Sequence, residues 1–323
     1  MGVTFVPLAA ESLGVRSMCT YVETPDVRIL IDPGASLGPR FGLLPHPREY
    51  KALKEARSRM AVRADQAEIV TISHYHFDHA TPTYTDQVWN LSSLPVAEQL
   101  YRNKLVLAKD YRSNINPSQR RRGWMLDGMI RKSVKRFEPA DGRTLSFGDT
   151  LLRFSEPVSH GEKNGALGWV LMLTVEHNGA RFMHASDVQG PMVPETMEKI
   201  TAEEPTVLYL GGPPTYLADY QGLTAQVERA WDNLERIVRV VPDVVIDHHL
   251  MRAGGWPQSF ERVVKASRDA GHRIRTAAQV LNIGDELLES QRKKLYEDEP
   301  PSAEFMNWTK LPEDKRRLTL PTF

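Results

Sequence analysis

Four side chains of the kinds that bind divalent metal ions stand within six residues of this sequence. They are His74, His76, Asp78 and His79. Neutral imidazole and carboxylate groups suit zinc and related divalent ions. In extended or tightly turned backbone, residues two apart project to the same side. The first two histidines can therefore share one ion, while the reversal of the chain turns the aspartate and the last histidine toward a second. This composition rarely gathers by chance in a polar loop, so the segment predicts a metal centre.

Three further candidate ligands each stand just after an expected strand. They are His160, Asp187 and His248. A lone residue of this kind is more often part of a capped turn or a buried hydrogen-bonded group. Their shared placement at strand ends favours a common site with the histidine cluster.

The chemistry that such a centre supplies is hydrolysis. Two divalent ions roughly 3.5 to 4 Å apart lower the pKa of a bridging water, so that hydroxide forms at neutral pH without a protein nucleophile. This fits a chain in which no Ser/His/Asp arrangement stands out and no Gly-x-Ser-x-Gly or phosphate-loop motif occurs. The ligands alone do not fix the electrophile, which is either a carbonyl carbon or phosphorus.

The elements that must position these residues are short strands and amphipathic helices. Expected strands lie at 3–8, 20–23, 27–31, 69–72, 104–107, 144–147, 151–155, 168–175, 180–184, 207–210 and 244–246. Expected helices lie at 47–64, within 117–136, at 223–241, and from Pro257 to a stop at Gly271. Asn178-Gly179 predicts a tight hairpin. Two groups of strands, each with helices attached, predict a layered α/β protein in which two sheets pack together under helices.

Composition narrows the class of protein. The chain has 323 residues, 41 basic against 41 acidic, and 41% hydrophobic residues, which is ordinary globular composition. Zero net charge argues against a uniformly basic surface for nucleic acid. The single Cys19 excludes an intramolecular disulfide and a cysteine-rich zinc site. No apolar stretch approaches the roughly 18 residues of a membrane helix. With no secretory signal at the N-terminus, we expect a cytoplasmic protein without a membrane partner.

Residues 102–136 are locally basic, with eleven lysines and arginines against two aspartates, and aromatic residues are interleaved with them. This mixture is typical of a surface that binds phosphates and stacks bases, so nucleic acid is a possible partner. A solvated helix face explains the same charges equally well. No feature of the sequence predicts an oligomeric state.

The segment His74 to His79 resembles the His-x-His-x-Asp-His motif of the metallo-β-lactamase superfamily without a departure. The resemblance continues in order through Asp32, His160-Gly161, Asp187 and His248. It implies that His74, His76 and His160 hold one ion, that Asp78, His79 and His248 hold the other, and that Asp187 bridges both. Asp32 would orient a ligand. Ser186 departs from the glycine that the family often has, and the adjacent His249 could replace His248 as ligand.

The resemblance covers residues 3 to 260 and implies a four-layer αββα sandwich. A single domain over 1–323 is then expected, with a partly helical insertion at about 85–140 and a charged C-terminal extension at about 280–323 that packs on the surface or trails off. The strings 11–18, 36–40 and 247–250 further resemble an uncharacterised archaeal family of metallo-β-lactamase-fold proteins.

The leading functional hypothesis is a dinuclear hydrolase that uses a metal-bound hydroxide on a phosphodiester or other phosphorylated substrate, either a small molecule or an oligonucleotide. Zinc is the first expectation for the two ions, and manganese or iron are alternatives. Asp78 and Asp32 are the expected catalytic carboxylates. The alternative is a lactonase or carboxylic-ester hydrolase of the sugar-phosphate lactonase type, because residues 14–17 and 31–33 resemble that branch. A third hypothesis is a non-catalytic metal- or RNA-binding module.

The remaining histidines are expected to lie away from the centre. His46, His177 and His272 fall in predicted loops and should be solvated. His184 ends an expected strand three residues before Asp187, so it is either a packed histidine or a group that supports the site.

Overall fold

The first sheet is built from the N-terminal half of the chain. The computed structural model describes residues 2–163, 165–218, 222–253 and 260–323. Six strands follow the order β1-β2-β3-β4-β5-β6. They are β1 (Thr4–Pro7), β2 (Thr20–Glu23), β3 (Arg28–Ile31), β4 (Ile69–Ile72), β5 (Leu105–Ala108) and β6 (Arg136–Pro139). The pairs from β3 to β6 are parallel, so the carboxyl ends of β3 and β4 lie at the same edge.

The second sheet holds seven strands in the order β15-β14-β13-β12-β11-β8-β7. They are β7 (Thr144–Phe147), β8 (Thr150–Phe154), β11 (Leu173–His177), β12 (Ala180–Ser186), β13 (Val207–Gly211), β14 (Asp243–Asp247) and β15 (Arg273–Arg275). Asn178 and Gly179, with φ of 50° and 81°, make the tight hairpin that the sequence predicts. The prediction of one continuous strand at 168–175 is wrong, because the structure has two strands there, β10 (Trp169–Val170) and β11. β10 pairs instead with β9 (Val158–Ser159), and Leu171 N–H donates to Ser73 O.

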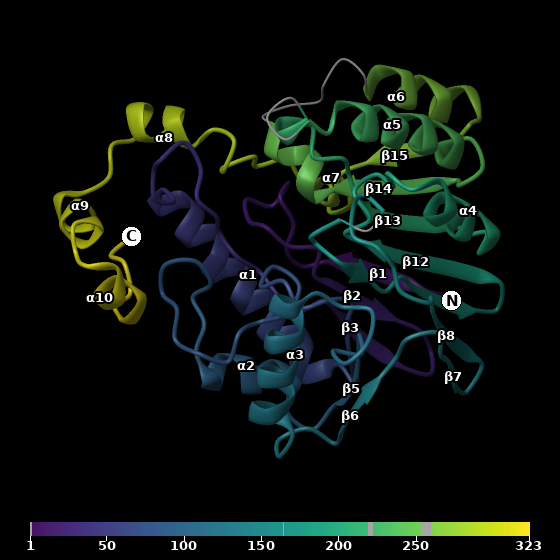
Figure 1. Ribbon diagram of the computed structural model, residues 1–323, viewed down its shortest axis with the longest axis horizontal. Helices are drawn as coiled ribbons and strands as arrows, with labels where there is room; N and C mark the ends of the chain where they lie inside the picture. The colour runs from purple at the N-terminus through teal and green to yellow at the C-terminus, as the bar shows by residue number, and fades with distance from the viewer. Residues whose placement is uncertain (1, 164, 219–221, 254–259) are drawn as a thin grey trace.

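Two sheets pack face to face and helices cover both outer surfaces, which confirms the four-layer sandwich (Figure 1). The period of two along each strand decides which side chain enters which layer. In β3, Ile29 and Ile31 face the second sheet, whereas Leu30 faces the helices. From the second sheet, Val175 and Tyr209 meet them in the central core.

Helices α1 (Pro47–Gln66), α2 (Leu94–Tyr101) and α3 (Pro117–Ile130) cover the first sheet, and α4 (Pro194–Ala202), α5 (Thr224–Val238) and α6 (Phe260–Asp269) cover the second. Two short 3₁₀ turns, η1 (Thr215–Leu217) and η2 (His248–Ala253), follow β13 and β14. Pro47 stands in the first turn of α1, as expected. The predicted start of α6 at Pro257 lies outside the described residues. No helix among those described is both long and apolar enough to cross a lipid bilayer.

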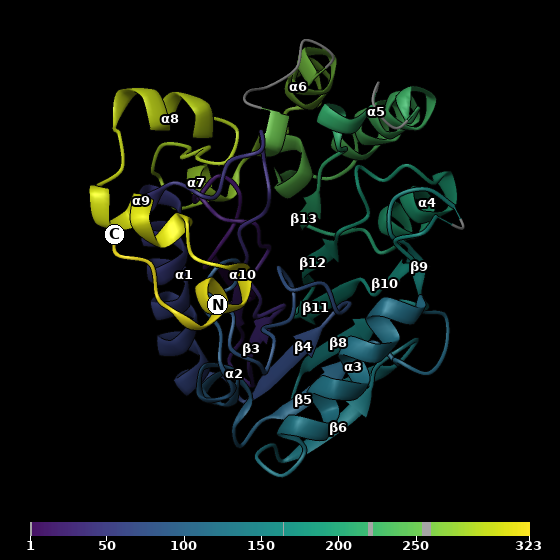
Figure 2. The same cartoon turned by 60° about the vertical axis from the view of Figure 1, so that its left-hand side comes forward.

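The charged C-terminal extension packs against α1 rather than trailing off (Figure 2). It contains α8 (Arg292–Asp298), α9 (Ala303–Thr309) and α10 (Glu313–Leu318), whereas α7 (Ala277–Val280) precedes it and contacts β1 and β14. The rings of Phe305 and Trp308 lie 6.0 and 5.7 Å from that of Tyr50 on α1. Arg292 also donates two hydrogen bonds of 2.8 Å to Glu49, and both side chains are 0% exposed. A buried, bidentate ion pair therefore fixes the extension to the domain.

Replacing Arg292 with alanine should lower the free energy of unfolding by about 3–5 kcal/mol, because Glu49 would keep a buried charge without a partner. Urea denaturation measures this loss. The matched control is Arg48→Ala, which removes an exposed pair with Glu299 in the same region and should cost less than about 1 kcal/mol. Equal losses in the two variants would contradict the anchoring role.

Candidate metal centre

The candidate ligands meet where strand ends of both sheets come together. Asp32 follows β3, and the segment His74 to His79 follows β4. His160 follows β9, Asp187 follows β12 and His248 follows β14. All of these are buried except His76 and Asp78, which are partly exposed. Every ligand candidate from the sequence thus lies in one place, although the two sheets contribute them from distant segments.

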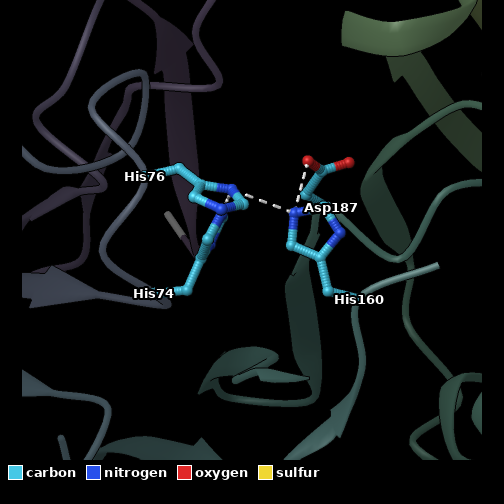
Figure 3. Close-up of side chains that lie close together, drawn as sticks. All are labelled: His74, His76, His160 and Asp187. Carbon is cyan, nitrogen blue, oxygen red and sulfur yellow. Dashed lines mark hydrogen bonds and ion pairs between the residues drawn. The ribbon is translucent and has the colours of Figure 1, made fainter. Parts of the chain in front are cut away.

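The first donor set consists of His74, His76, His160 and Asp187, whose candidate ligand atoms all lie within 4.8 Å of one another. Nδ1 of His76 is 3.1 Å from Nε2 of His74 and 3.2 Å from Nε2 of His160. Oδ2 of Asp187 is 3.0 Å from the same His160 atom. Figure 3 shows the three rings converging, with the carboxylate beside His160. Three imidazoles and a carboxylate at this spacing are a complete donor set for one divalent ion.

The second donor set consists of Asp78, His79 and His248, again within 4.8 Å. Nε2 of His248 lies 3.6 Å from Oδ2 of Asp78 and 3.5 Å from Oδ2 of Asp187. The Asp187 carboxylate therefore borders both sets, which is the position that a bridging ligand would need.

The two adjacent histidines differ in their surroundings, although candidate ligand atoms of both lie within 4.8 Å of the Asp187 carboxylate. His248 has φ of 63°, and its backbone N–H donates to Oδ1 of Asp247 at 2.7 Å. This conformation turns its ring into the second donor set. His249 contacts Asp187 through Nε2 at 3.0 Å, but its Nδ1 faces the Tyr216 hydroxyl at 3.2 Å, and its side chain lines the adjoining pocket. We therefore favour His248 as the ligand and place His249 in the pocket wall.

The protonation states suit metal binding. Burial lowers the pKa of His74 and His248 well below the ordinary value and lowers that of His76 to about 3. Burial alone would raise the pKa of Asp78 and Asp187, but the neighbouring histidines outweigh it and lower both. At neutral pH these three imidazoles are neutral and the carboxylates ionised, whereas for His79 the effect of burial is outweighed by Asp32, which raises the pKa of that ring. Among the described residues, Nε2 of His79 and Oδ1 of Asp187 are buried without a hydrogen-bond partner. Free, buried donor atoms of this kind fit a divalent ion.

Asp32 lies behind His79 rather than in the pocket. Its carboxylate accepts from Nδ1 of His79 at 2.9 Å, and from the Ser73 N–H at 2.7 Å and hydroxyl at 2.5 Å. It is 0% exposed and does not line the pocket, and its contact leaves Nε2 of His79 free. These contacts suit the ligand-orienting role that the resemblance implies for Asp32. Ser186 has φ of 58°, where glycine would be easiest, and donates a 2.7 Å hydrogen bond to the Ser73 hydroxyl.

Asp32→Asn should weaken metal binding about 10- to 100-fold, because the amide nitrogen would face groups that now donate to the carboxylate. A chelator competition titration measures the affinity, and thermal unfolding of the metal-free variant shows whether the fold survives. An unchanged affinity in a folded variant would rule out the positioning role.

Sequence reasoning missed a buried arginine at the second donor set. Arg252 is 4% exposed, and its guanidinium lies 3.5 Å from Oδ2 of Asp78 and 3.3 Å from both ring nitrogens of His248. Glu11 is its hydrogen-bonded ion-pair partner. The only sequence signal was the string at 11–18, which the resemblance singled out without assigning a role to Glu11.

The expectation that the loop histidines are solvated is wrong for two of them. His46 and His177 are buried, at 2% and 5% exposure, rather than solvated. His46 caps α1 and reaches Glu299 O at 2.8 Å, while His177 lies 3.6 Å from Asp26. His272 is partly exposed, and its Nδ1 lies 2.9 Å from Val238 O. His184 is a packed histidine whose Nε2 lies 3.0 Å from Met18 O. None of the four belongs to a donor cluster among the described residues.

A sandwich of this architecture with these donor sets defines a metal-dependent hydrolase of the β-lactamase superfamily, and the profile of the beta-lactamase superfamily domain matches residues 15–249. Within that superfamily the chain belongs to the UPF0282 family. It is 41% identical over 296 residues to the UPF0282 protein of Methanopyrus kandleri, covering 91% of this chain and 99% of that one. It is 39% identical over 292 residues to the one of Methanocaldococcus jannaschii, covering 90% and 95%.

Solved structures with a similar fold are more distant. CmlA, a diiron β-hydroxylase from Streptomyces venezuelae, is 13% identical with a TM-score of 0.46, and the match covers 85% of this chain and 52% of CmlA. Tm1679, a metal-dependent hydrolase of the β-lactamase superfamily, is 14% identical with a TM-score of 0.44, and the match covers 85% of this chain and 96% of that one. Likeness at this level does not bear on the reaction.

Proposed function

We propose that this protein is a two-metal hydrolase of a small phosphorylated substrate, with a phosphodiester as the first candidate. His74, His76 and His160 would hold one ion, and Asp78, His79 and His248 the other, with Asp187 between them. Two such ions supply activated water and stabilise negative charge on the electrophile. Zinc is the expected metal, because the donors are imidazole and carboxylate.

The observation that carries the choice of phosphate is the set of cations around the pocket over the donor sets. This metal pocket has a volume of about 610 Å³ and is lined by His76, Asp78, His160, Asp187 and His249 on the metal side. Four arginines also line it, namely Arg16, Arg122, Arg252 and Arg317. A phosphate ester brings a negative charge that guanidinium groups bind well, whereas a neutral lactone does not.

Two of the four arginines matter most. Arg16 and Arg317 form ion pairs with Glu289 and Glu313, so their charge is largely balanced. Arg122 has no carboxylate within ion-pair distance among the described residues. Arg252 is paired with Glu11, but its outer nitrogens face Asp78 and the two histidines that follow β14. These two groups can orient an anionic substrate and stabilise the charge that builds up on its oxygens.

The contacts of the locally basic segment argue against its use as one extended surface for anions. Three of its eleven basic residues pair with carboxylates outside residues 102–136, and one of these pairs is Arg102 with Glu98. Lys109 pairs with Asp141, Arg136 with Glu138, and Lys104 is buried against Ala67 O. Arg112 and Arg131 pair with Asp110 and Asp127 inside the segment. The segment is therefore not a continuous basic surface, and a small anionic substrate is favoured over a long nucleic acid.

Metal-loaded protein should hydrolyse bis(p-nitrophenyl) phosphate or a short oligonucleotide, with release of p-nitrophenolate or of nucleotides as the readout. A lactone panel is run beside it, since the same ions would serve a carboxylic ester. If the phosphate substrates survive and a lactone is opened, the lactonase alternative replaces this proposal. If neither class is turned over by protein that holds metal, the non-catalytic binding module replaces both.

A further inference from the structure

A second pocket lies beside the metal pocket. This side pocket has a volume of about 450 Å³ and is lined by residues of the segment 75–84 and of α3. It shares three residues with the metal pocket, namely Phe77, Tyr84 and Arg122. A ligand could therefore occupy both spaces at once, with these three side chains at the boundary.

The walls of the side pocket are aromatic and apolar. The rings of Phe77 and Tyr84 are 5.7 Å apart and meet edge to face at 78°. Met125 and Leu126 of α3 complete the lining from the other side. Aromatic rings in such arrangements offer faces on which another planar group can stack. A volume of this size is in the ordinary range for small-molecule sites.

The pocket is held in shape by its neighbours. The Tyr75 hydroxyl donates to Lys109 O at 2.5 Å, and its N–H donates to the Gln119 side chain of α3 at 3.0 Å. A Cβ on Gly123 would lie 2.6 Å from Cβ of Tyr111 and 2.7 Å from the Tyr75 ring, so α3 sits as close as glycine permits. The insertion that holds α3 therefore forms one preformed wall of the side pocket.

The charged side chains that line the side pocket are all basic. Arg121 and Arg122 line it, and no carboxylate does among the described residues. The Arg122 guanidinium lies 4.1 Å from the centre of the Phe77 ring and donates to Tyr75 O at 3.3 Å. Stacked in this way, it keeps further N–H groups for an anion at the boundary between the two pockets.

We propose that the side pocket binds a planar aromatic group of the substrate, and that Arg122 contacts the phosphate that joins this group to the metal pocket. The substrate class is then an aromatic phosphate ester. This inference rests on the proposed phosphate hydrolysis, because it assigns the rest of the same substrate.

The test is equilibrium binding of two phosphonates that cannot be hydrolysed at a P–O ester bond. Phenylphosphonate should bind zinc-loaded protein at least about tenfold more tightly than methylphosphonate by calorimetry, since only the phenyl ring fills the side pocket. Arg122→Gln should weaken both ligands about tenfold. The control is Arg120→Gln, an exposed arginine of α3 that lines neither pocket and should change nothing.

A variant that fills the side pocket distinguishes the effect of its shape on binding from the effect of the Arg122 charge. Met125→Trp should remove the preference for phenylphosphonate and leave methylphosphonate binding as it was, and Ser118→Phe at the exposed rim serves if the first variant does not fold. Two results would overturn the proposed role of the side pocket, even if phosphodiesters are hydrolysed. One is equal binding of the two phosphonates, and the other is a preference for phenylphosphonate that persists in the variant with the filled pocket. If the filled-pocket variant loses the preference for phenylphosphonate but the protein hydrolyses no phosphate ester, the result supports the role of the side pocket and overturns the proposed function.

Discussion

Replacing His76 with alanine is expected to lower the rate of hydrolysis at least about a thousandfold, because catalysis by a bound ion contributes several kcal/mol. His76 is the central contact of the first donor set, with Nδ1 3.1 Å from His74 Nε2 and 3.2 Å from His160 Nε2. It is also partly exposed in the pocket, so its removal leaves little unfilled volume in the core. The variant should therefore fold normally and lose metal.

Metal analysis and kcat on the best substrate of the panel check this expectation together. His272→Ala is the matched control, since His272 is partly exposed like His76 and its ring bonds only Val238 O among the contacts described. The control should keep full metal content and activity. Equal activity in His76→Ala and the control would show that the reaction does not depend on this centre.

Much of the fold was predictable because it follows from local patterns. The apolar run in β3, the uniformly buried run Ile69–Ile72 and the turn at Asn178-Gly179 are local patterns, and each predicts its own element. The histidine cluster was predictable for the same reason, since its residues are neighbours in sequence and in space. The break inside 168–175 was not, because it depends on a hydrogen bond from Leu171 to the distant Ser73.

The interactions that the sequence concealed join residues far apart in the chain. Glu11 and Arg252 are 241 positions apart, and Glu49 and Arg292 are 243 apart. A charge count over a window cannot pair such groups, which is why the segment 102–136 looked more basic than it is. Lys109 shows the difficulty, because it is fully buried against Asp141, beyond the end of that window. Long-range pairing decides which charges reach a substrate.

The two histidines that follow β14 offer the sharpest test of a second ion. His248 is 0% exposed and belongs to the second donor set, whereas His249 is 9% exposed and lines the metal pocket. His248→Ala should reduce the stoichiometry from two ions to one and lower kcat at least about a hundredfold, because the second ion stabilises charge in the reaction.

His249→Ala is the matched partner of that variant. It removes the same side chain one position along and should keep both ions, with a loss of activity within about tenfold that reflects a contact in the pocket wall. Metal stoichiometry by mass spectrometry under native conditions, measured beside kcat, distinguishes the two. If His249→Ala loses an ion while His248→Ala keeps both, His249 is the ligand, and the left-handed backbone at His248 positions its neighbour instead. If both variants keep two ions, the second donor set does not need either histidine of η2, and Asp78, His79 and Asp187 must suffice to hold that ion.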